Sequence, residues 1–369
     1  MSASTVTGSA PGRVNLIGEH TDYNGGLCLP LALPQRTTVT VTARGDDVLS
    51  LTSAQESAQW EGQVDDRPDG WAAYAAGVIA VLRTDGHAVP GFTASIDSDV
   101  PLGAGLSSSA ALECAVAVSA AALLGLDLDG DTGPETRRML ADACRRAEND
   151  YVGAPTGGMD QTVAMLGRAG HALLLDFTDG GVTPVALPLD DDGLVLLVID
   201  TRVSHTLTDG SYGDRRGECA AAASALGVDS LRDAALDLLE GLADPVLRRR
   251  ARHVITENAR VLAAVAALES GDWSGLAEVL DDSHASMRDD FEISCAELDL
   301  AVETARAAGA LGARMTGGGF GGSAVALVPD VAVAAVQDAV TAAFAAAGHG
   351  APAFLVATPS EAARIEDVS

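Results

Sequence analysis

Hydrophobic and polar residues alternate in two short stretches near the start of the chain. Residues 37–42 read TTVTVT and residues 48–52 read VLSLT, a period of two that predicts β-strands. Three residues that favour turns, Gly45, Asp46 and Asp47, lie between the two stretches. The pattern therefore predicts two strands that pair with each other across this turn.

Helical spacing follows these strands. Across residues 71–82 apolar side chains recur every three or four positions, which predicts an amphipathic helix, and residues 92–96 form the next expected strand. Helices are expected again over 107–124 and 135–151, and the glycines of 153–158 should interrupt the chain. The second half is expected to contain buried strands at 171–177 and 194–200, mainly helices over 210–309, a strand at 323–328, a helix to about residue 347 and a strand at 353–357.

The length of the chain divides this pattern into two parts. A chain of 369 residues is too long for one ordinary core, so we expect two domains, 1–180 and 181–369, with a ligand site in the cleft between them. Both parts contain strands and helices, so each is expected to combine the two kinds of element. We expect the chain to be a monomer.

The charge of the chain excludes several kinds of partner. Its 52 acidic residues outnumber its 23 basic residues, and a net charge of -29 would repel nucleic acid and anionic membrane surfaces. Every basic residue is an arginine, so no Walker A lysine is available to contact a phosphate group. A nucleotide therefore needs another kind of binding loop.

Cysteine usage and the N-terminal residues indicate the compartment. The five cysteines are far apart and form no CxxC pair, which favours reduced thiols over a disulfide framework or a zinc site. The segment MSASTVTGSAPGR contains neither an apolar run nor a basic region of the kind found in secretory signals. We therefore expect a cytoplasmic protein without a membrane-spanning segment.

A stretch rich in glycine and serine gives the first chemical signal. Residues 101–110 read PLGAGLSSSA and connect an expected strand to an expected helix. Gly103 and Gly105 allow the backbone to approach a ligand closely, and the free amides at the start of the helix form an anion site. The hydroxyls at 107–109 can bind phosphate oxygens or a metal ion. A helix N-cap with a serine-rich first turn is the alternative interpretation.

A second signal is the density of polar residues at 13–26, RVNLIGEHTDYNGG, which contains only three aliphatic side chains. Glu19 and Asp22, with His20 between them, are suited to binding several sugar hydroxyls, because fixed donors and acceptors reject analogues that lack a hydroxyl. A polar surface turn is one alternative. A metal site is another, although these three residues lack a regular helical spacing of ligands.

A third stretch, MTGGGFGGS at 315–323, precedes an expected strand and forms a loop that only glycine can build where the backbone passes close to another group. A tight connector is the alternative. In their order and spacing, the three stretches resemble the motifs of the GHMP small-molecule kinases, and GRVNLIGEHTDYNGG at 12–26 is similar to the signature of the galactokinases among them. The resemblance spans the chain and implies a two-domain α/β (α+β) GHMP kinase fold with mixed sheets and helices, which uses ATP and Mg2+ in the cleft between its domains.

The resemblance assigns residues to the nucleotide and the metal ion. Trp71 matches an aromatic residue that borders the adenine, although a core position is equally common for such a tryptophan. Glu148, in CRRAEND, matches the acidic metal partner, and a surface carboxylate beside Arg145 is the alternative. The motif departs from the usual galactokinase pattern at Ala104, where a further glycine is common. The phosphate loop implied for the triphosphate comprises Gly103, Gly105, Leu106, Ser107, Ser108 and Ser109, with Ser108 or Ser109 near Mg2+.

GGMDQ at 157–161 is similar to the segment that carries the catalytic aspartate. The resemblance implies that Asp160 accepts or positions the proton of the anomeric hydroxyl, while Arg13 keeps Asp160 charged and stabilises the transferring phosphoryl group. A helix N-cap is the alternative for Asp160. Tyr212, in SYGDRR, is assigned only through its place after TRVSHTL. The implied sugar contacts are Glu19, His20, Asp22, Gly157, Gly158 and Tyr212.

The expected reaction transfers the γ-phosphoryl group of ATP to O1 of α-D-galactose, giving galactose 1-phosphate and ADP. A kinase for N-acetylgalactosamine, arabinose or another sugar is the alternative within the same class. A non-catalytic sensor of galactose and ATP is the alternative outside it. Such sensors lose small residues in the phosphate loop, whereas residues 107–110 are uninterrupted here and Arg13 and Asp160 are both present.

Overall fold

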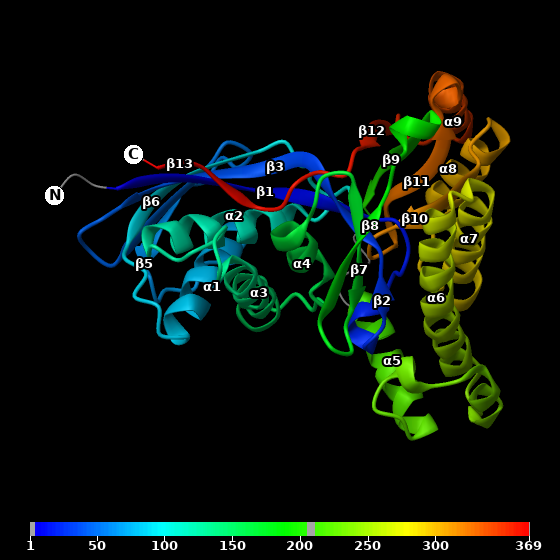
Figure 1. Cartoon of the computed structure of the whole chain (residues 1–369), viewed down its shortest axis with the longest axis horizontal. Coiled ribbons are helices and arrows are strands. Elements are labelled where there is room, and N and C mark those ends of the chain that lie inside the picture. The colour runs from blue at the N-terminus through cyan, green and yellow to red at the C-terminus, as the bar shows by residue number, and fades with distance from the viewer. Residues whose placement is uncertain (1–3, 205–210, 369) are drawn as a thin grey trace.

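The computed structural model describes residues 4–204 and 211–368, which fold into three β-sheets flanked by helices (Figure 1). The strands are β1 (Thr5–Asn15), β2 (Leu27–Cys28), β3 (Pro30–Ala43), β4 (Val48–Ser53), β5 (Trp60–Gln63), β6 (Phe92–Ser98), β7 (His171–Asp176), β8 (Gly181–Ala186), β9 (Leu194–Ser204), β10 (Gly312–Thr316), β11 (Gly321–Pro329), β12 (Ala353–Ala357) and β13 (Arg364–Val368). The α-helices are α1 (Trp71–Thr84), α2 (Ser108–Leu123), α3 (Gly133–Arg146), α4 (Met159–Leu166), α5 (Ser211–Leu226), α6 (Pro245–Ser270), α7 (Trp273–Ser286), α8 (Ala296–Ala307) and α9 (Val333–Ala347).

The first sheet has the strand order β13-β1-β3-β6-β4-β5, and α1 to α4 cover one of its faces (Figure 1). The predicted pairing of residues 37–42 with residues 48–52 is wrong. β6 lies between β3 and β4, pairing antiparallel with the first and parallel with the second, and the hairpin partner of β4 is β5. Alternation in the sequence reports which face of a strand is buried, whereas the neighbour of a strand depends on distant residues.

Most of the other predicted elements are confirmed. The helices expected over 71–82 and 107–124 are α1 and α2, and the helix expected over 135–151 is α3 followed by a π-helical turn, Ala147–Val152. The strands expected near 92, 171, 194, 323 and 353 are β6, β7, β9, β11 and β12. Helices α5 to α8 lie in the region expected to be helical, although residues 205–210, which include the end of TRVSHTL, lie outside the described part of the chain.

Burial along β3 explains how the first sheet forms. Val39 and Val41 are fully buried in the core beneath the helices. Thr38 and Thr40 point to the opposite face, where the Thr40 hydroxyl lies 3.0 Å from the hydroxyl of Thr7 on β1. The period-two pattern therefore sorts valine to the helical side of the sheet and threonine to its outer side.

Of the other two sheets, the larger belongs to the second half of the chain, and the smaller combines β2 and β7 of the first half with β8 of the second. The order β10-β11-β9-β12 forms a four-stranded sheet, which packs against α7 and α8, and the order β2-β7-β8 forms a small sheet beside it. The domain boundary at residue 180 stays a prediction, but two strand pairings join residues on either side of it. β8 pairs with β7, and β13, at the C-terminus, returns to pair with β1 in the first sheet (Figure 1).

A continuous apolar core joins the two halves beneath the site. Val14 and Leu31, from strands of the first half, are buried in the same cluster as Leu196 on β9 and Leu276 on α7. Shared burial of this kind fixes the orientation of the segments that it connects. The loops that follow β1 and precede α2 are therefore held against the second half.

One segment of the described residues, 330–347 around α9, is long and apolar enough to cross a membrane by length and composition alone, and 17% of it is buried. A single segment of this kind is weak evidence, because core helices of soluble proteins pass the same test. The absence of a membrane partner stays a prediction.

Candidate active site

Arg13 and Asp160 meet in a bidentate ion pair, although they are 147 residues apart in the chain. Nε and Nη2 of Arg13 donate to the two carboxylate oxygens of Asp160 at 2.8 and 2.9 Å. Nη1 of Arg13 donates to the carbonyl of Gly105 at 2.6 Å, and the Arg13 amide donates to the carbonyl of Leu106. One buried arginine on β1 thereby joins the glycine and serine loop to the first turn of α4, which contains Asp160.

The glycine and serine loop leads directly into α2. Gly103 and Gly105 have positive φ angles of 74° and 73°, a conformation that favours glycine, and both are exposed. Ser107 is the N-cap of α2 and also has a positive φ, 60°, which is uncommon for serine. Its hydroxyl donates to Oδ2 of Asp160. The exposed loop and the free amides of α2 therefore open beside Asp160, an arrangement suited to an anion.

Glu148 is buried, which excludes the alternative of a surface carboxylate beside Arg145. It lies in the π-helical turn that follows α3, a local geometry that often occurs at functional sites. The amide of Gln161 donates to Oε2 of Glu148 at 2.6 Å, and the Ser109 side chain also hydrogen-bonds to this carboxylate. Burial, together with the charge of Asp160, raises the pKa of Glu148 to about 7.

Glu19 is held by groups from both halves of the chain. Its Oε2 accepts from Arg314 and from Asn15, the latter at 2.8 Å, and its Oε1 accepts from the Thr316 hydroxyl and the Gly317 amide at 3.1 and 2.9 Å. Burial raises the pKa of Glu19, and the contact with Arg314 opposes this shift. Four internal donors leave this carboxylate less free to bind a sugar than the sequence suggested.

Arg314 and Glu257 complete this group beneath the sugar-binding loop. Arg314 is fully buried on β10 and also donates to the carbonyl of Leu16 at 2.9 Å. Glu257 accepts from the Gly18 amide at 3.1 Å and from Arg260 at 2.7 Å. Burial raises the pKa of Glu257, but the neighbouring Arg260, His253 and Arg314 outweigh burial and lower it to about 2.

His20 also links the two halves. Its Nε2 lies 3.2 Å from the carbonyl of Gly318, which can only accept, so this nitrogen carries the proton. Nδ1 then accepts from the Tyr23 hydroxyl at 2.7 Å. The ring packs against Tyr212 and Phe291, each with its centroid at 4.9 Å, and burial lowers the pKa of His20 to about 3. His20 is therefore neutral and fixed in orientation, with a φ of 61°.

Asp22 lies against the loop before α4. A Cβ added to Gly157 would lie 2.1 Å from Oδ2 of Asp22, so only glycine fits there. Asp22 accepts from the Tyr23 amide at 2.9 Å. Burial, with a further contribution from the charge of Asp160, raises the pKa of Asp22 to about 6. A carboxylate with few internal partners is available to a hydroxylated ligand.

These side chains surround a pocket of about 170 Å³ to which both halves contribute. The first half supplies both catalytic candidates and three of the predicted sugar-binding side chains, and the second half supplies Tyr212 and the backbone of the glycine run. The lining residues are Arg13, Glu19, His20, Asp22, Glu148, Pro155, Thr156, Met159, Asp160, Tyr212, Gly317 and Gly318. The predicted position of the site between the two halves thus agrees with this geometry.

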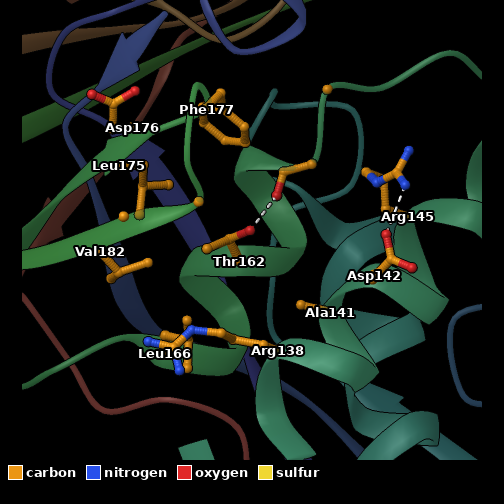
Figure 2. A pocket seen from close by; sticks show the side chains of 14 residues that line it. Arg138, Ala141, Asp142, Arg145, Thr162, Leu166, Leu175, Asp176, Phe177 and Val182 are labelled. Carbon is orange, nitrogen blue, oxygen red and sulfur yellow. Dashed lines mark hydrogen bonds and ion pairs between the residues drawn. The ribbon is translucent and has the colours of Figure 1, made fainter. Parts of the chain in front are cut away.

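The predicted sugar contacts Gly157 and Gly158 do not line this pocket but a second one of about 230 Å³ (Figure 2). The Thr162 hydroxyl on α4 donates to the Gly158 carbonyl at 2.7 Å, which fixes the backbone beside the second pocket. Nη2 of Arg145 donates to Oδ1 of Asp142 at 2.7 Å (Figure 2). A side chain at Gly157 would clash with Asp22 of the first pocket, and one at Gly158 would press on Arg145 of the second.

The glycine run at 317–322 passes close to the phosphate loop, as the sequence predicts. A Cβ on Gly317 would lie 3.2 Å from the carbonyl of Gly105, and the Ser323 hydroxyl donates to the carbonyl of Ala104 at 2.6 Å. The run therefore closes the site from the second half. Ala104 is itself buried, so its methyl group points into the core rather than toward a ligand.

Several functional residues were missed by sequence reasoning. Arg314 is the one charged residue in the apolar strand GARMT, a signal that could have identified it. Gln161 and Glu113 were missed because nothing local distinguishes them from helix-surface residues. Trp71 lies at the start of α1, partly buried against the core of the first half, and its role at the adenine stays a prediction. Among the described residues, no group of three or more histidines, cysteines or carboxylates is placed so that it could hold a metal ion.

Three family profiles match the chain. The galactokinase galactose-binding signature matches residues 2–43, the GHMP kinase N-terminal domain matches residues 73–168, and the GHMP kinase C-terminal domain matches residues 264–346. The first contains the polar stretch at 13–26, and the second contains the phosphate loop and Asp160.

Proteins of known name are similar over nearly the whole chain. Galactokinases from Streptomyces coelicolor and Mycobacterium tuberculosis are 52% and 49% identical to it, over 96% and 95% of this chain and 93% and 96% of their own lengths. A crystal structure of Lactococcus lactis galactokinase complexed with galactose has a TM-score of 0.91 at 33% identity, covering 98% of this chain and 95% of that one. A mevalonate kinase shares the fold alone, with a TM-score of 0.68 at 14% identity, covering 98% and 99% of the two chains.

Proposed function

The chain belongs to the galactokinase family of the GHMP kinases, and we propose that it transfers the γ-phosphoryl group of ATP to O1 of galactose. The observation that carries this proposal is the bidentate pair of Arg13 and Asp160 at the floor of a pocket beside the glycine and serine loop. The pair sits where a sugar hydroxyl and a terminal phosphate can meet.

We assign the proton step to Asp160. Its carboxylate accepts the proton of the anomeric hydroxyl as the oxygen attacks the γ-phosphorus, and the bond from that phosphorus to the β–γ bridging oxygen of ATP breaks. Arg13 fixes both oxygens of Asp160 and places positive charge beside the transferring group. Catalysis then comes mostly from positioning and electrostatic stabilisation.

Asp22, His20 and Tyr212 are the side chains that we propose to bind and orient the sugar. Asp22 retains free acceptor capacity, whereas both ring nitrogens of His20 are engaged, so the imidazole contributes mainly a fixed wall. Glu19 positions the loop through Arg314 and lines the pocket with its remaining surface. We propose that Gly157 acts through Asp22, because it leaves room for that carboxylate where a larger residue would clash.

The residues present fit a magnesium ion. We call Asp22, Glu113, Glu148 and Asp160 the acidic cluster, and among the described residues Arg13 is the only cation that is ion-paired with it. Glu148 and the Ser109 hydroxyl supply hard oxygen ligands of the type that Mg2+ prefers, with Ser108 beside them on α2. Bound there with ATP, the ion would neutralise charge on the phosphates.

The substitution Asp160→Asn tests this assignment. It should lower kcat by at least about 100-fold, because the general base is lost, while galactose and ADP still bind. Turnover is measured by coupled ADP detection, and binding by calorimetry. Asp142→Asn, on the surface of α3, is the matched control and should leave turnover unchanged. Similar turnover by wild type and Asp160→Asn would overturn the assignment and would favour a positioning role for another group.

A sugar panel tests the substrate. Galactose, N-acetylgalactosamine and arabinose are compared by kcat/KM in the same assay, and galactose should be the most efficient. A preference for either of the other sugars would replace galactose in the proposal, and an absence of turnover with every sugar in the presence of ATP would favour the non-catalytic sensor.

A further inference from the structure

Gln161 connects two buried carboxylates behind the proposed metal site. It follows Asp160 on α4 and is 0% exposed. Its amide nitrogen donates to Oε2 of Glu148 at 2.6 Å and to Oε2 of Glu113 at 3.0 Å. A side-chain amide has two N–H donors, so both are used, and one side chain joins α2, α4 and the π-helical turn after α3.

Burying the side chains of Glu113 and Gln161 in apolar surroundings has a free-energy cost. Glu113 is 0% exposed on α2, its neighbours in the helix core are mainly alanine and valine, and no cation is ion-paired with it among the described residues. Oε1 of Glu113 and Oε1 of Gln161 are both buried and have no partner within the described part of the chain. Apolar residues of the same volume would pack these helices at lower cost, so packing alone does not explain the group.

We propose that Gln161 is a positioning residue for the metal-binding carboxylate Glu148 and that Glu113 anchors Gln161. This inference rests on the proposed function, which assigns Glu148 to the metal ion. Gln161 occupies Oε2 of Glu148 and so orients the carboxylate through one oxygen, leaving the other for a ligand. Carboxylates that bind metals are commonly oriented by such hydrogen bonds.

The position of Gln161 in the chain couples two parts of the site. Asp160 and Gln161 are consecutive on the first turn of α4, and their side chains bind different partners, Arg13 in one case and Glu148 in the other. A shift of α4 would therefore move the proposed base and the metal-side carboxylate together. The hydrogen bond from Gln161 to Glu148 therefore fixes the distance between Glu148 and Asp160, because Gln161 and Asp160 share one turn of α4.

The test compares ADP binding with Mg2+ and ADP binding with a chelator, measured by calorimetry on the full chain. The ratio of the two affinities is the magnesium gain. Gln161→Met removes both donors at similar volume and should lower this gain by at least about 10-fold. Affinity for ADP in chelator and affinity for galactose should stay within about twofold of wild type, because neither contacts Gln161.

Further variants grade the effect. Glu113→Met removes the anchor and should lower the gain less than Gln161→Met does, whereas Glu113→Gln keeps an acceptor oxygen and should retain most of it. Gln63→Met, on the exposed strand β5, is the matched control and should change nothing. If Gln161→Met does not fold, Gln161→Asn, which is one methylene shorter and cannot reach both carboxylates, carries the same expectation.

A full magnesium gain in folded Gln161→Met would overturn the proposal. Equal losses of ADP affinity with Mg2+ and with chelator would also overturn it, because they would indicate a purely structural role. A wild-type chain whose ADP affinity does not respond to Mg2+ would overturn the metal assignment itself, and the positioning role with it. That failure is visible before any residue is changed, which separates the two outcomes.

Discussion

Two groups of buried carboxylates flank the pocket, and they are neutralised in different ways. We call Glu19, Glu257, Arg260 and Arg314 the arginine cluster, in which two carboxylates contact two guanidinium groups. The acidic cluster has four carboxylates and one guanidinium, that of Arg13. The pKa of Glu257 in the arginine cluster is lowered to about 2 and that of Glu148 in the acidic cluster is raised to about 7, whereas burial raises the pKa of Glu19 despite its contact with Arg314.

This contrast indicates what each cluster does. Buried charges that are paired with opposite charges hold a structure in place, and the arginine cluster fixes the loop after β1 through its ion pairs. Buried carboxylates without enough cations are unfavourable until a cation arrives. Under the proposed function, a bound Mg2+ ion would supply this missing positive charge to the acidic cluster.

The largest expected effect comes from breaking the arginine cluster. Arg314→Met should lower the free energy of unfolding by about 3–5 kcal/mol, because the buried carboxylates of Glu19 and Glu257 lose a cation. Urea unfolding at neutral pH measures the change. Arg44→Met removes an exposed ion pair with Asp46 and is the control, expected to unfold like wild type. Equal stability of Arg314→Met and wild type would contradict the structural role of this cluster.

The second prediction concerns pH. Asp22 has a raised pKa of about 6, so the folded state binds more protons than the unfolded state, and stability falls as pH rises through the window between 3.8 and about 6. Glu257 has the opposite sign, because its lowered pKa contributes stability that is lost only as pH falls below 4.5 toward about 2.

Between about pH 4.5 and about pH 7, Asp22 alone should therefore lower the free energy of unfolding of the ligand-free chain by about 2 kcal/mol, and Glu148 acts in the same direction. Asp22→Asn should flatten this slope. Urea unfolding of the two proteins across the pH window checks the prediction. Parallel pH slopes of the free energy of unfolding for wild type and Asp22→Asn would contradict a raised pKa of Asp22 in the folded state.

The smallest effect comes from a matched pair of substitutions at two fully buried glutamates. Glu257→Gln should cost about 1–2 kcal/mol, because it removes a charge that Arg260 and Arg314 require. Glu113→Gln should change the free energy of unfolding by less than about 1 kcal/mol, because burial holds the pKa of Glu113 well above its usual value and its neighbours are carboxylates. Both are measured by urea unfolding at neutral pH, and equal costs would remove the distinction between the clusters.

Much of the fold was predictable because its signals are local. The helices α1, α2 and α3 were recognised from apolar spacing, and the phosphate loop from glycines and serines placed between a strand and a helix. The pairing of β3 with β4 was wrong, because the strand that separates them, β6, comes about forty residues later in the chain. Strand order depends on such long-range contacts, which no short pattern contains.

The site, too, has features that short sequence patterns predict and features that depend on long-range contacts. The sequence by itself determined which segments carry chemistry, because phosphate binding and sugar binding need unusual residue types in short stretches such as 12–26 and 101–110. Only the tertiary structure decided how those residues are used. Glu19 is engaged with Arg314, 295 positions away, and Gln161 bridges to Glu113, 48 positions away. The pairing of a buried charge is a property of its neighbours in space, and folding alone brings those neighbours together.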